Sequence, residues 1–314
     1  MRLRSVVAID LGGTNVRLGI VDSSGRVRRR RRLKMTPFER KDELCRWLAA
    51  HVKALVDGED GLPRPGAVGI GFAGPAKAER GLVYYAPNVG RLENIEVGRY
   101  LRRSVGLPTV VENDANCAAV GEYWRGAGRG ARSLFMFTVG TGIGGSFLID
   151  GEVWHGADGI AGEIGHTVVA AGGPVCNCGA RGCLEALVSA WAIVRDYNRP
   201  VGRSRPPKAG SAGAKIVFDM AKRGDRRAQR AIEHASRALG LGIANVFHLL
   251  NPDLILIGGG VSRAGAVLLK PALEEARRSI FPPLRERLTV RRATLRDDAG
   301  LLGAAQLALR ELKP

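Results

Sequence analysis

The densest group of reactive side chains in this sequence is a set of three cysteines and one histidine. Cys176, Cys178 and Cys183 lie within eight residues, and His166 stands ten residues before the first of them. Three thiolates and one imidazole make up a tetrahedral ligand set that structural zinc sites use. A disulfide with one spare thiol is the alternative, but an odd number of cysteines suits it poorly. The spacing therefore predicts a zinc site.

Two glutamates, Glu163 and Glu185, flank the cysteine-rich stretch on either side. The four ligands already complete a zinc shell and leave no open position for a reactive water, so the metal is expected to be structural. The two carboxylates then remain to contact something else. We expect this zinc stretch to form one wall of a pocket for a polar molecule.

A glycine-rich loop, Asp10-Leu-Gly-Gly-Thr-Asn15, follows the first strand-like run. A second strand-like run comes next, whereas a dinucleotide-binding fingerprint would continue into a helix. In a glycine hairpin the backbone N–H groups can approach phosphate oxygens closely. Asp10 would stand where it can hold Mg²⁺, directly or through water, and Thr14 adds a hydroxyl. An ordinary tight hairpin is the alternative for this loop taken alone.

Two further glycine loops occur later in the chain. Gly140-Thr-Gly-Ile-Gly-Gly145 joins two strand-like runs, and Gly258-Gly-Gly260 follows another apolar run. Each loop alone is weak evidence, but in this order the three indicate an ATP site in a cleft between two domains. The residues expected to bind the nucleotide are Asp10, Gly12, Gly13, Thr14, Asn15, Thr138, Gly140, Thr141, Gly142, Gly258, Gly259 and Gly260.

The tripeptide Glu112-Asn113-Asp114 lies between the two glycine hairpins, where a predicted strand ends and a helix begins. Asp114 could cap that helix, or it could act as a general base. Phosphoryl transfer needs positioning, charge neutralisation and a carboxylate that accepts the proton of the attacking hydroxyl. The other amides and carboxylates that would suit a polyhydroxylated substrate are Asn88, Asn113, Glu163 and Glu185.

The elements that must position these residues follow a duplicated plan. Residues 6–9, 16–21 and 26–33 read as strands, and residues 134–139 and 146–149 repeat the strand, glycine turn and strand. The repeat predicts two similar α/β domains, residues 1–114 with 300–314 and residues 115–299, the second carrying the zinc insertion at 163–185. Further strands are expected at 67–72, 81–85, 108–111, 253–257 and 288–295, and helices at 39–56, 97–104, 114–125, 214–223, 226–250, 264–279 and 299–312.

The sequence is strongly basic, with a net charge of +18 and an arginine run at residues 28–32. That run is expected on an edge strand, where charge discourages pairing with another sheet. Nucleic acid is one possible partner, but aromatic residues make up 5% of the chain and do not interleave with the arginines, so no stacking platform is evident. We expect a solvated surface whose positive field helps to attract an anionic substrate such as a nucleotide phosphate.

Length and hydrophobicity fit one large or two ordinary globular domains. The chain has 314 residues, of which 45% are hydrophobic, enough to bury sizeable cores. No apolar run reaches the roughly 18 residues that a membrane span requires, and the N-terminus lacks a signal-peptide pattern. We therefore expect a cytoplasmic protein.

The chain resembles the ROK family of sugar kinases, within the actin/hexokinase-like ATPase superfamily, over essentially its full length. The most specific match is Glu163-x-x-His166 followed by Cys176-x-Cys178-Gly-x-x-Gly-Cys183-x-Glu185, and the three glycine segments match the family's nucleotide segments. The resemblance implies two ribonuclease H-like domains, a homo-oligomer (dimer or tetramer), Asp114 as catalytic base, and zinc held by His166 and the three cysteines. It also implies a sugar pocket lined by Asn88, Asn113, Asp114, Glu163, His166 and Glu185.

The expected reaction is the ATP-dependent phosphorylation of a hexose at its 6-hydroxyl. Glucose is the expected sugar, because Ala86-Pro-Asn88 is similar to the glucose-specific version of the sugar loop. N-acetylmannosamine, N-acetylglucosamine and fructose are the alternatives. A sugar-responsive DNA-binding regulator is an alternative of another class, since the family contains repressors with an N-terminal helix-turn-helix. This sequence begins directly with the first ATPase strand, which favours an enzyme that uses a hexose and MgATP.

Overall fold

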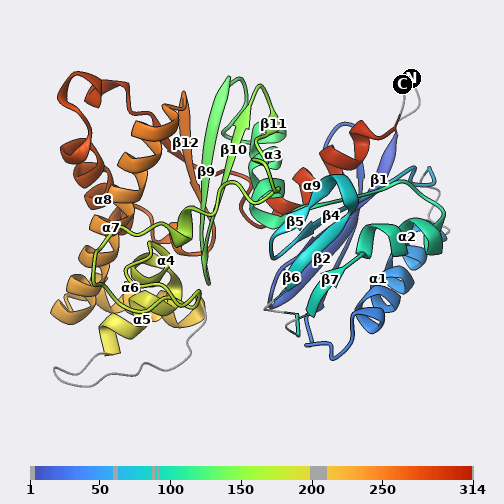
Figure 1. The fold of residues 1–314 in the computed structure, drawn as a ribbon, viewed down its shortest axis with the longest axis horizontal. Helices are drawn as coiled ribbons and strands as arrows, with labels where there is room; N and C mark the ends of the chain where they lie inside the picture. The colour runs from blue at the N-terminus through green and yellow to red at the C-terminus, as the bar shows by residue number, and fades with distance from the viewer. Residues whose placement is uncertain (1–3, 59–62, 87–88, 91, 199–210, 313–314) are drawn as a thin grey trace. The chain divides into compact units, whose positions relative to one another are not determined.

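The computed structural model describes residues 4–58, 63–86, 89–90, 92–198 and 211–312 (Figure 1). The chain divides into two compact units. The first unit comprises Met1–Gly130, Phe147–Ala161 and Leu295–Pro314, and the second comprises Ala131–Ser146 and Gly162–Thr294. A boundary at residue 114 would separate helix α3 (Asp114–Arg125) from helix α9 (Ala299–Arg310), but these two helices pack closely together within the first unit.

The first unit is built on a mixed sheet with the strand order β3-β2-β1-β4-β8. Strands β1, β2 and β3 pair antiparallel, whereas β1, β4 and β8 run parallel. Strand β3 lies at the edge and carries the arginine run, as predicted. The strands are β1 (Ser5–Leu11), β2 (Asn15–Asp22), β3 (Val27–Lys34), β4 (Val68–Phe72) and β8 (Thr109–Asn113).

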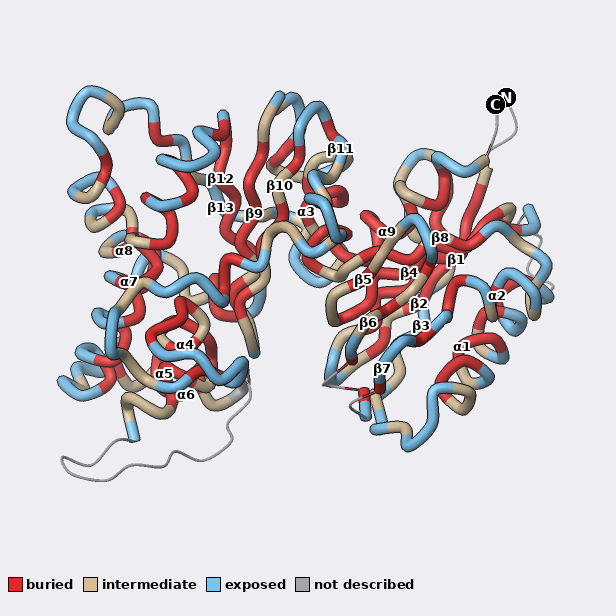
Figure 2. The backbone as a smooth tube through the Cα atoms, viewed as in Figure 1, coloured by how far each residue is buried: buried red, intermediate tan, exposed pale blue. Residues whose placement is uncertain are grey.

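Side chains of β1 alternate between the two faces of this sheet, as a strand geometry requires. Val7, Ile9 and Leu11 join one core with helices α1 (Lys41–Val56) and α2 (Val97–Val105). Val6 and Ala8 join a second core with α9. Because both faces are covered, β1 and β4 are buried along their whole length, as Figure 2 shows.

Glycines allow helices α3 and α9 to approach each other closely. A methyl group on Gly303 of α9 would lie 1.6 Å from the carbonyl oxygen of Cys117 in α3. A methyl group on Gly121 of α3 would likewise lie 2.1 Å from the carbonyl oxygen of Ala299. Only glycine fits at these positions without moving one backbone away from the other.

A small sheet in the first unit was only partly predicted. Its strands are β5 (Ala76–Lys77), β6 (Leu82–Ala86) and β7 (Leu92–Ile95), in the order β5-β6-β7. The sequence predicted β6 alone, since the other two strands are too short to show a period of two residues.

The second sheet has the order β11-β10-β9-β12-β13, so its strands follow the same spatial sequence as those of the first sheet. The duplicated plan predicted from the two glycine turns is thereby confirmed. Its strands are β9 (Ser133–Val139), β10 (Ile143–Ile149), β11 (Glu152–Val153), β12 (Leu254–Gly258) and β13 (Val290–Arg292). Two expected strand bounds were wrong: β10 already starts inside the glycine turn, and the strand expected at 288–295 is only the short edge strand β13.

Helices account for most of the remainder of the second unit, and Figure 1 shows α4, α5 and α6 gathered at one end of α7. Asp225 caps α7, because its carboxylate accepts hydrogen bonds from the N–H groups of Arg227 and Ala228. In the described part of the chain, no helix is long and apolar enough to cross a membrane. The helices are α4 (Glu185–Val188), α5 (Ala190–Asn198), α6 (Ser211–Lys222), α7 (Arg226–Leu250) and α8 (Ala266–Ser279).

Candidate functional site

The predicted metal ligands lie together in the second unit. The ligand atoms of His166, Cys176, Cys178 and Cys183 are all within 4.8 Å of one another. The Sγ atoms of Cys178 and Cys183 are 3.7 Å apart, and Cys176 Sγ is 3.7 Å from His166 Nδ1. Zn–S bonds of about 2.3 Å in a tetrahedron place two sulfurs about 3.8 Å apart. The residues therefore fit a tetrahedral zinc ion.

Tight turns bring these ligands together. The Cys176 N–H donates to the Ala180 carbonyl at 2.8 Å, and the Gly179 N–H donates back to the Cys176 carbonyl at 3.0 Å. Gly182 has φ of +76°, and a methyl group there would lie 1.7 Å from the Ala170 carbonyl oxygen. Gly182 is therefore required both by its left-handed backbone and by this close approach.

Burial raises the pKa of the Cys176 thiol to about 12. A buried thiolate is unfavourable without a compensating positive charge. A bound cation would supply that charge, since metal ions coordinate the thiolate and displace its proton.

Glu185 connects this cluster to the second glycine loop. It begins helix α4, and its Oε2 accepts a hydrogen bond from the Ile143 N–H at 3.0 Å. A methyl group on Gly142 would lie 2.5 Å from the same oxygen. The Ala190 N–H at the start of α5 donates to the Gly140 carbonyl at 2.9 Å. The loop between β9 and β10 is therefore held by α4 and α5.

His166 and Glu163 lie beside each other at the edge of the cluster. The imidazole Nδ1 faces Cys176, while Nε2 is 4.0 Å from Glu163 Oε2. Both side chains are exposed. One face of the imidazole can therefore bind a metal while the other, with Glu163, remains available for a ligand.

Strands β9 and β12 end side by side, at the edge where the expected nucleotide residues of the second unit lie. Thr138 is opposite Gly258 in the parallel register, and in α/β sheets ligands bind beyond the carboxyl ends of parallel strands. The loop after β9 is closed by a hydrogen bond of 2.9 Å from the Gly140 N–H to the Gly142 carbonyl. Gly259 has φ of +85°, and a methyl group there would lie 2.4 Å from the Val139 carbonyl oxygen.

The first unit has an equivalent edge, formed by the carboxyl ends of β1, β4 and β8. Leu11 is opposite Phe72, and Phe72 is opposite Asn113. The glycine loop after β1 is closed by a hydrogen bond of 3.1 Å from the Gly12 N–H to the Asn15 carbonyl, and Thr14 at its tip is exposed. The residues expected for nucleotide and for catalysis in this unit therefore share one sheet edge.

Asp10 is buried at this edge, at the start of helix α9. Its Oδ2 accepts a hydrogen bond of 2.9 Å from Arg17, and its Oδ1 faces Gly300, where a methyl group would lie 2.8 Å away. Burial raises the pKa of the Asp10 carboxyl, although Arg17 opposes that shift. Of the two Asp10 oxygens, Arg17 contacts Oδ2. Oδ1 could then bind Mg²⁺, which commonly uses one or two carboxylates together with phosphates and waters.

Asn113 and Asp114 form the turn from β8 into α3. The helix is capped by Asn113, whose Oδ1 accepts from the N–H groups of Ala115 and Asn116 at 2.9 and 3.3 Å. The Asn113 Nδ2 also donates to the Gly74 carbonyl at 3.0 Å. The N-cap is therefore Asn113, and Asp114 is the first residue of the helix. Its half-buried side chain accepts a hydrogen bond of 2.9 Å at Oδ1 from the Ala115 N–H.

Two residues of this site, Glu112 and His155, were not assigned a role from sequence. Glu112 is buried at 2% exposure, and its Oε2 is 2.6 Å from His155 Nε2. They are 43 positions apart in sequence, so no spacing pattern links them. The signal that could have drawn attention to them is a carboxylate placed within an otherwise buried strand.

The other expected sugar residue, Asn88, lies outside the described residues. The remaining expected residues fall into two groups, one in each unit. The first unit contains Asp10, Gly12, Gly13, Thr14, Asn15, Asn113 and Asp114, and the second contains Thr138, Gly140, Thr141, Gly142, Glu163, His166, Cys176, Cys178, Cys183, Glu185, Gly258, Gly259 and Gly260.

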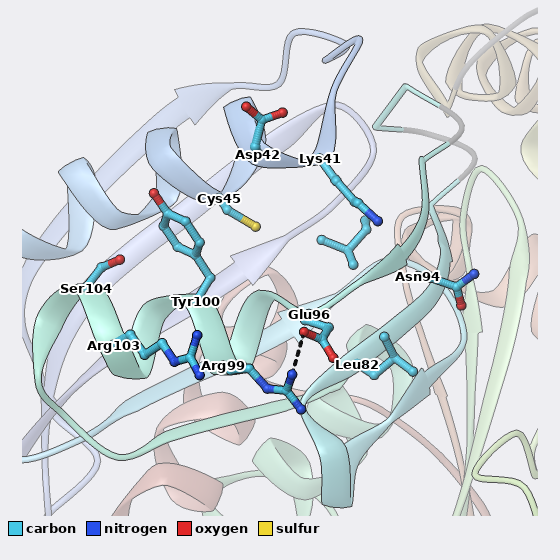
Figure 3. Close-up of a pocket in the computed structure, with 11 residues that line it drawn as sticks. Lys41, Asp42, Cys45, Leu82, Asn94, Glu96, Arg99, Tyr100, Arg103 and Ser104 are labelled. Atoms are coloured by element: carbon cyan, nitrogen blue, oxygen red, sulfur yellow. Dashed lines mark hydrogen bonds and ion pairs between the residues drawn. The ribbon is translucent and has the colours of Figure 1, made fainter.

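A pocket of about 700 Å³ lies elsewhere in the first unit, between α1, α2, β6 and β7 (Figure 3). Its wall includes Cys45, Tyr100 and Arg103, together with an ion pair of 3.0 Å between Arg99 and Glu96. None of the expected site residues that the structure describes lines it. The pocket is therefore separate from the sheet edge that carries Asp10 and Asp114.

Comparison with known proteins identifies the family of the chain. The ROK family profile matches residues 6–311. The chain is 38% identical to a glucokinase of Thermotoga maritima, covering 96% of each protein. It is 35% identical to a glucokinase of Halalkalibacterium halodurans, covering 97% of this chain and 94% of that protein.

A solved structure agrees with these sequence relatives. The ROK family glucokinase of Streptomyces griseus, determined in complex with glucose and AMPPNP, aligns with a TM-score of 0.81 at 34% identity. The alignment covers 98% of this chain and 99% of that one. By its sequence and by its duplicated actin-like ATPase α/β fold, this chain belongs to the ROK family.

Proposed function

We propose that this protein is an ATP-dependent glucokinase, which transfers the γ-phosphoryl group of MgATP to the 6-hydroxyl of glucose. Glucokinases at 38% and 35% identity over nearly the whole chain support this reaction, as does the related structure with glucose and AMPPNP. The observation that carries the proposal is the position of Asp114. It is a half-buried carboxylate at the carboxyl end of a parallel strand, on the same sheet edge as Asp10.

Asp114 would accept the proton of the sugar 6-hydroxyl as that oxygen attacks the γ-phosphorus. A carboxylate in this role contributes through position and charge more than through covalent chemistry. Asn113 supports the position, because it caps α3 and binds the Gly74 carbonyl at the same time. Asp114 is thereby held at a helix N-terminus, where the helix dipole favours the charged carboxylate.

The sugar hydroxyls would be bound by the amide and carboxylate side chains of the expected pocket. Glu163 and the Nε2 edge of His166 supply a carboxylate acceptor and a ring nitrogen in the second unit. When bound, zinc would act as a scaffold, held by His166, Cys176, Cys178 and Cys183, and would fix the imidazole tautomer. The full set proposed for the sugar is Asn88, Asn113, Asp114, Glu163, His166 and Glu185.

The glycine loops after β1, β9 and β12 would hold the nucleotide. Their backbone N–H groups can approach phosphate oxygens because glycines carry no side chain. Asp10 would hold Mg²⁺, which would supply positive charge to neutralise the phosphates. The two hydroxyls of Thr14 and Thr141 lie exposed at the loop tips, where they can add hydrogen bonds to the phosphates.

A cytoplasmic location and a homo-oligomeric state complete the proposal. All five cysteines are free of disulfide bonds, which suits a reducing compartment. The family resemblance implies a dimer or tetramer, which light scattering on the purified protein would determine. Nucleic acid is not expected as a partner.

The proposal is tested by measuring ADP formation with MgATP and a panel of sugars. The panel contains glucose, mannose, fructose, N-acetylglucosamine and N-acetylmannosamine. We expect the highest kcat/KM with glucose. Highest activity with an N-acetylhexosamine would replace glucose as the substrate, and absence of turnover with every sugar would refute a sugar kinase.

A further inference from the structure

A buried carboxylate lies directly behind the Asn113–Asp114 turn. Glu112 Oε1 accepts a hydrogen bond of 2.7 Å from the Asn113 backbone N–H. The same oxygen accepts one of 2.9 Å from Asn116 Nδ2, within the first turn of α3. One carboxylate oxygen therefore fixes both the last residue of β8 and the first turn of the helix that begins at Asp114.

The other oxygen of this carboxylate is held by His155. The distance from Glu112 Oε2 to His155 Nε2 is 2.6 Å. The side chain of Glu112 is 3% exposed, whereas that of His155 is 38% exposed. The buried carboxylate thus has a partner that can exchange protons with solvent. A buried carboxylate is unfavourable in its charged form without a cation or a full set of hydrogen-bond donors. A positive charge on His155 therefore stabilises the charged form of Glu112.

A closed loop holds the backbone of His155. The residue follows strand β11, and its carbonyl accepts a hydrogen bond of 3.0 Å from the Ala161 N–H. Gly156, the next residue, has φ of +69°, which a β-branched or bulky residue would adopt only with strain. The imidazole is therefore presented to Glu112 by a defined turn within the first unit.

We propose that His155 is a positioning residue. In its protonated form it fixes the Glu112 carboxylate, and that carboxylate fixes the Asn113–Asp114 turn, which presents Asp114 to the sugar. This inference rests on the proposed function, because it takes Asp114 as the catalytic base. Deprotonation of His155 at alkaline pH would weaken the Glu112 ion pair and loosen this turn. Turnover would then fall although the Asp114 side chain itself is unchanged.

The groups that face His155 favour its charged form. Hydrogen bonding to Glu112 raises the pKa of His155 above its ordinary value, burial opposes the shift, and the carboxylates of Glu112, Glu79 and Glu152 add to it. The imidazolium therefore persists above the usual histidine value of about 6.5. Because the pKa of His155 is raised on folding, the contribution of its charge to stability is present below the unfolded value of about 6.5 and is lost as pH rises through the raised pKa.

The pH dependence of kcat separates His155 from Asp114. Protonation of a general base removes activity on the acid side, so Asp114 accounts for the acid limb. His155 accounts for an alkaline limb. An arginine at position 155 would keep a positive charge and N–H donors at every pH in this range, so His155→Arg removes the alkaline limb if the inference holds.

The test compares kcat, KM and the pH profile of wild type, His155→Gln and His155→Arg. We expect His155→Gln to lower kcat by about tenfold to a hundredfold, the effect of misplacing a catalytic group by a fraction of an ångström to 1 Å. KM for glucose should change less than threefold. His155→Arg should restore kcat to within about threefold of wild type and abolish the alkaline limb.

His51→Gln is the matched control. His51 is also half-buried, and its Nδ1 contacts the Trp47 carbonyl at 2.8 Å within α1, away from the turn. It should leave kcat and the pH profile unchanged. His155→Gln with wild-type kcat and profile would overturn the inference, as would His155→Arg with an unaltered alkaline limb.

A second measurement requires no substitution of His155. Proton NMR of the imidazole should show His155 titrating above 6.5 in wild type, and closer to 6.5 in Glu112→Gln. A titration at or below 6.5 in wild type would overturn the inference. Absence of sugar turnover by wild type would refute the proposed function itself, whereas an active wild type with an unaffected His155→Gln would refute only the role of His155.

Discussion

At the residue scale, the account depends on the Asp114 carboxylate. Asn113 is the N-cap of α3, and Asp114 Oδ1 also accepts a hydrogen bond of 2.9 Å from the Ala115 N–H. The carboxylate also sits one residue beyond a strand that aligns with β4 and, through it, with β1. We propose a chemical role for the carboxylate at this position.

Asp114→Asn should retain the shape of the side chain and lose the proton acceptor. We expect kcat to fall by about a hundredfold to ten-thousandfold, the usual contribution of a general base. Glucose affinity, measured by calorimetry, should remain within severalfold of wild type. Asp57→Asn, an exposed aspartate at the end of α1, is the control and should leave kcat unchanged. Near-normal turnover by Asp114→Asn would contradict the base assignment.

The sequence could predict which site residues lie together when those residues are close to one another along the chain. The metal ligands lie close together because tight local turns join them, and such turns are encoded by the nearby glycines. Glu112 and His155 are different, because β8 and the segment after β11 bring together residues 43 positions apart. A contact of that kind depends on tertiary packing, which no local pattern encodes.

At the element scale, the cluster of His166, Cys176, Cys178 and Cys183 can be tested by removing one ligand. Cys178→Ser removes one ligand and should reduce zinc from about one per chain toward none, since four ligands are needed for a tight structural site. The Glu185 contact with the glycine loop should loosen with it. We therefore expect KM for glucose to rise by tenfold or more (a loss of about 1.4 kcal/mol in binding).

Metal content by elemental analysis and KM by the coupled assay check this prediction together. Cys45→Ala is the control, since Cys45 is buried in α1 and belongs to a different core. It should keep its zinc. Full zinc content in Cys178→Ser would show that the four residues are not the ligand set.

The contact between α3 and α9 predicts a stability effect. A methyl group at position 303 would lie 1.6 Å from the Cys117 carbonyl, so Gly303→Ala must push the two helices apart. We expect the free energy of unfolding to fall by about 1–3 kcal/mol, as for other overpacked cores, measured by urea denaturation. Gln306→Ala, on the same helix, should change it by less than about 0.5 kcal/mol. Equal stability of the two variants would contradict the close packing.

Long elements could be predicted because their burial is periodic, whereas short elements could not. Helices α1 and α7 show an apolar face repeated over several turns. Strands β5 and β11 have two residues each and form only where neighbouring strands supply partners. The start of β10 was misplaced because glycines at 144 and 145 were interpreted as a turn, although the ladder continues through them.

At the scale of the whole molecule, the net charge of +18 predicts a salt effect on one substrate only. MgATP is anionic and glucose is neutral, so only the nucleotide responds to the field of the protein. Raising the ionic strength from about 0.01 M to 1 M shortens the Debye length from about 30 Å to 3 Å. KM for MgATP should rise severalfold over this range while KM for glucose stays constant.

Steady-state kinetics at several concentrations of sodium chloride check this prediction, with potassium glutamate as a second salt to exclude a chloride-specific effect. An equal rise in both KM values would indicate a general effect of salt on the fold. A KM for MgATP that is independent of salt would show that the positive charge has no part in nucleotide binding.

The most direct test of the central claim is to identify the product. Protein and MgATP are incubated with ¹³C-labelled glucose, and Asp114→Asn is incubated in parallel. The hydroxyl that carries the phosphoryl group is identified by ³¹P and ¹³C NMR. The account predicts glucose 6-phosphate from the wild-type protein and almost none from the variant in the same time. Phosphorylation of another hydroxyl, no phosphorylated glucose, or equal product from both proteins would contradict it.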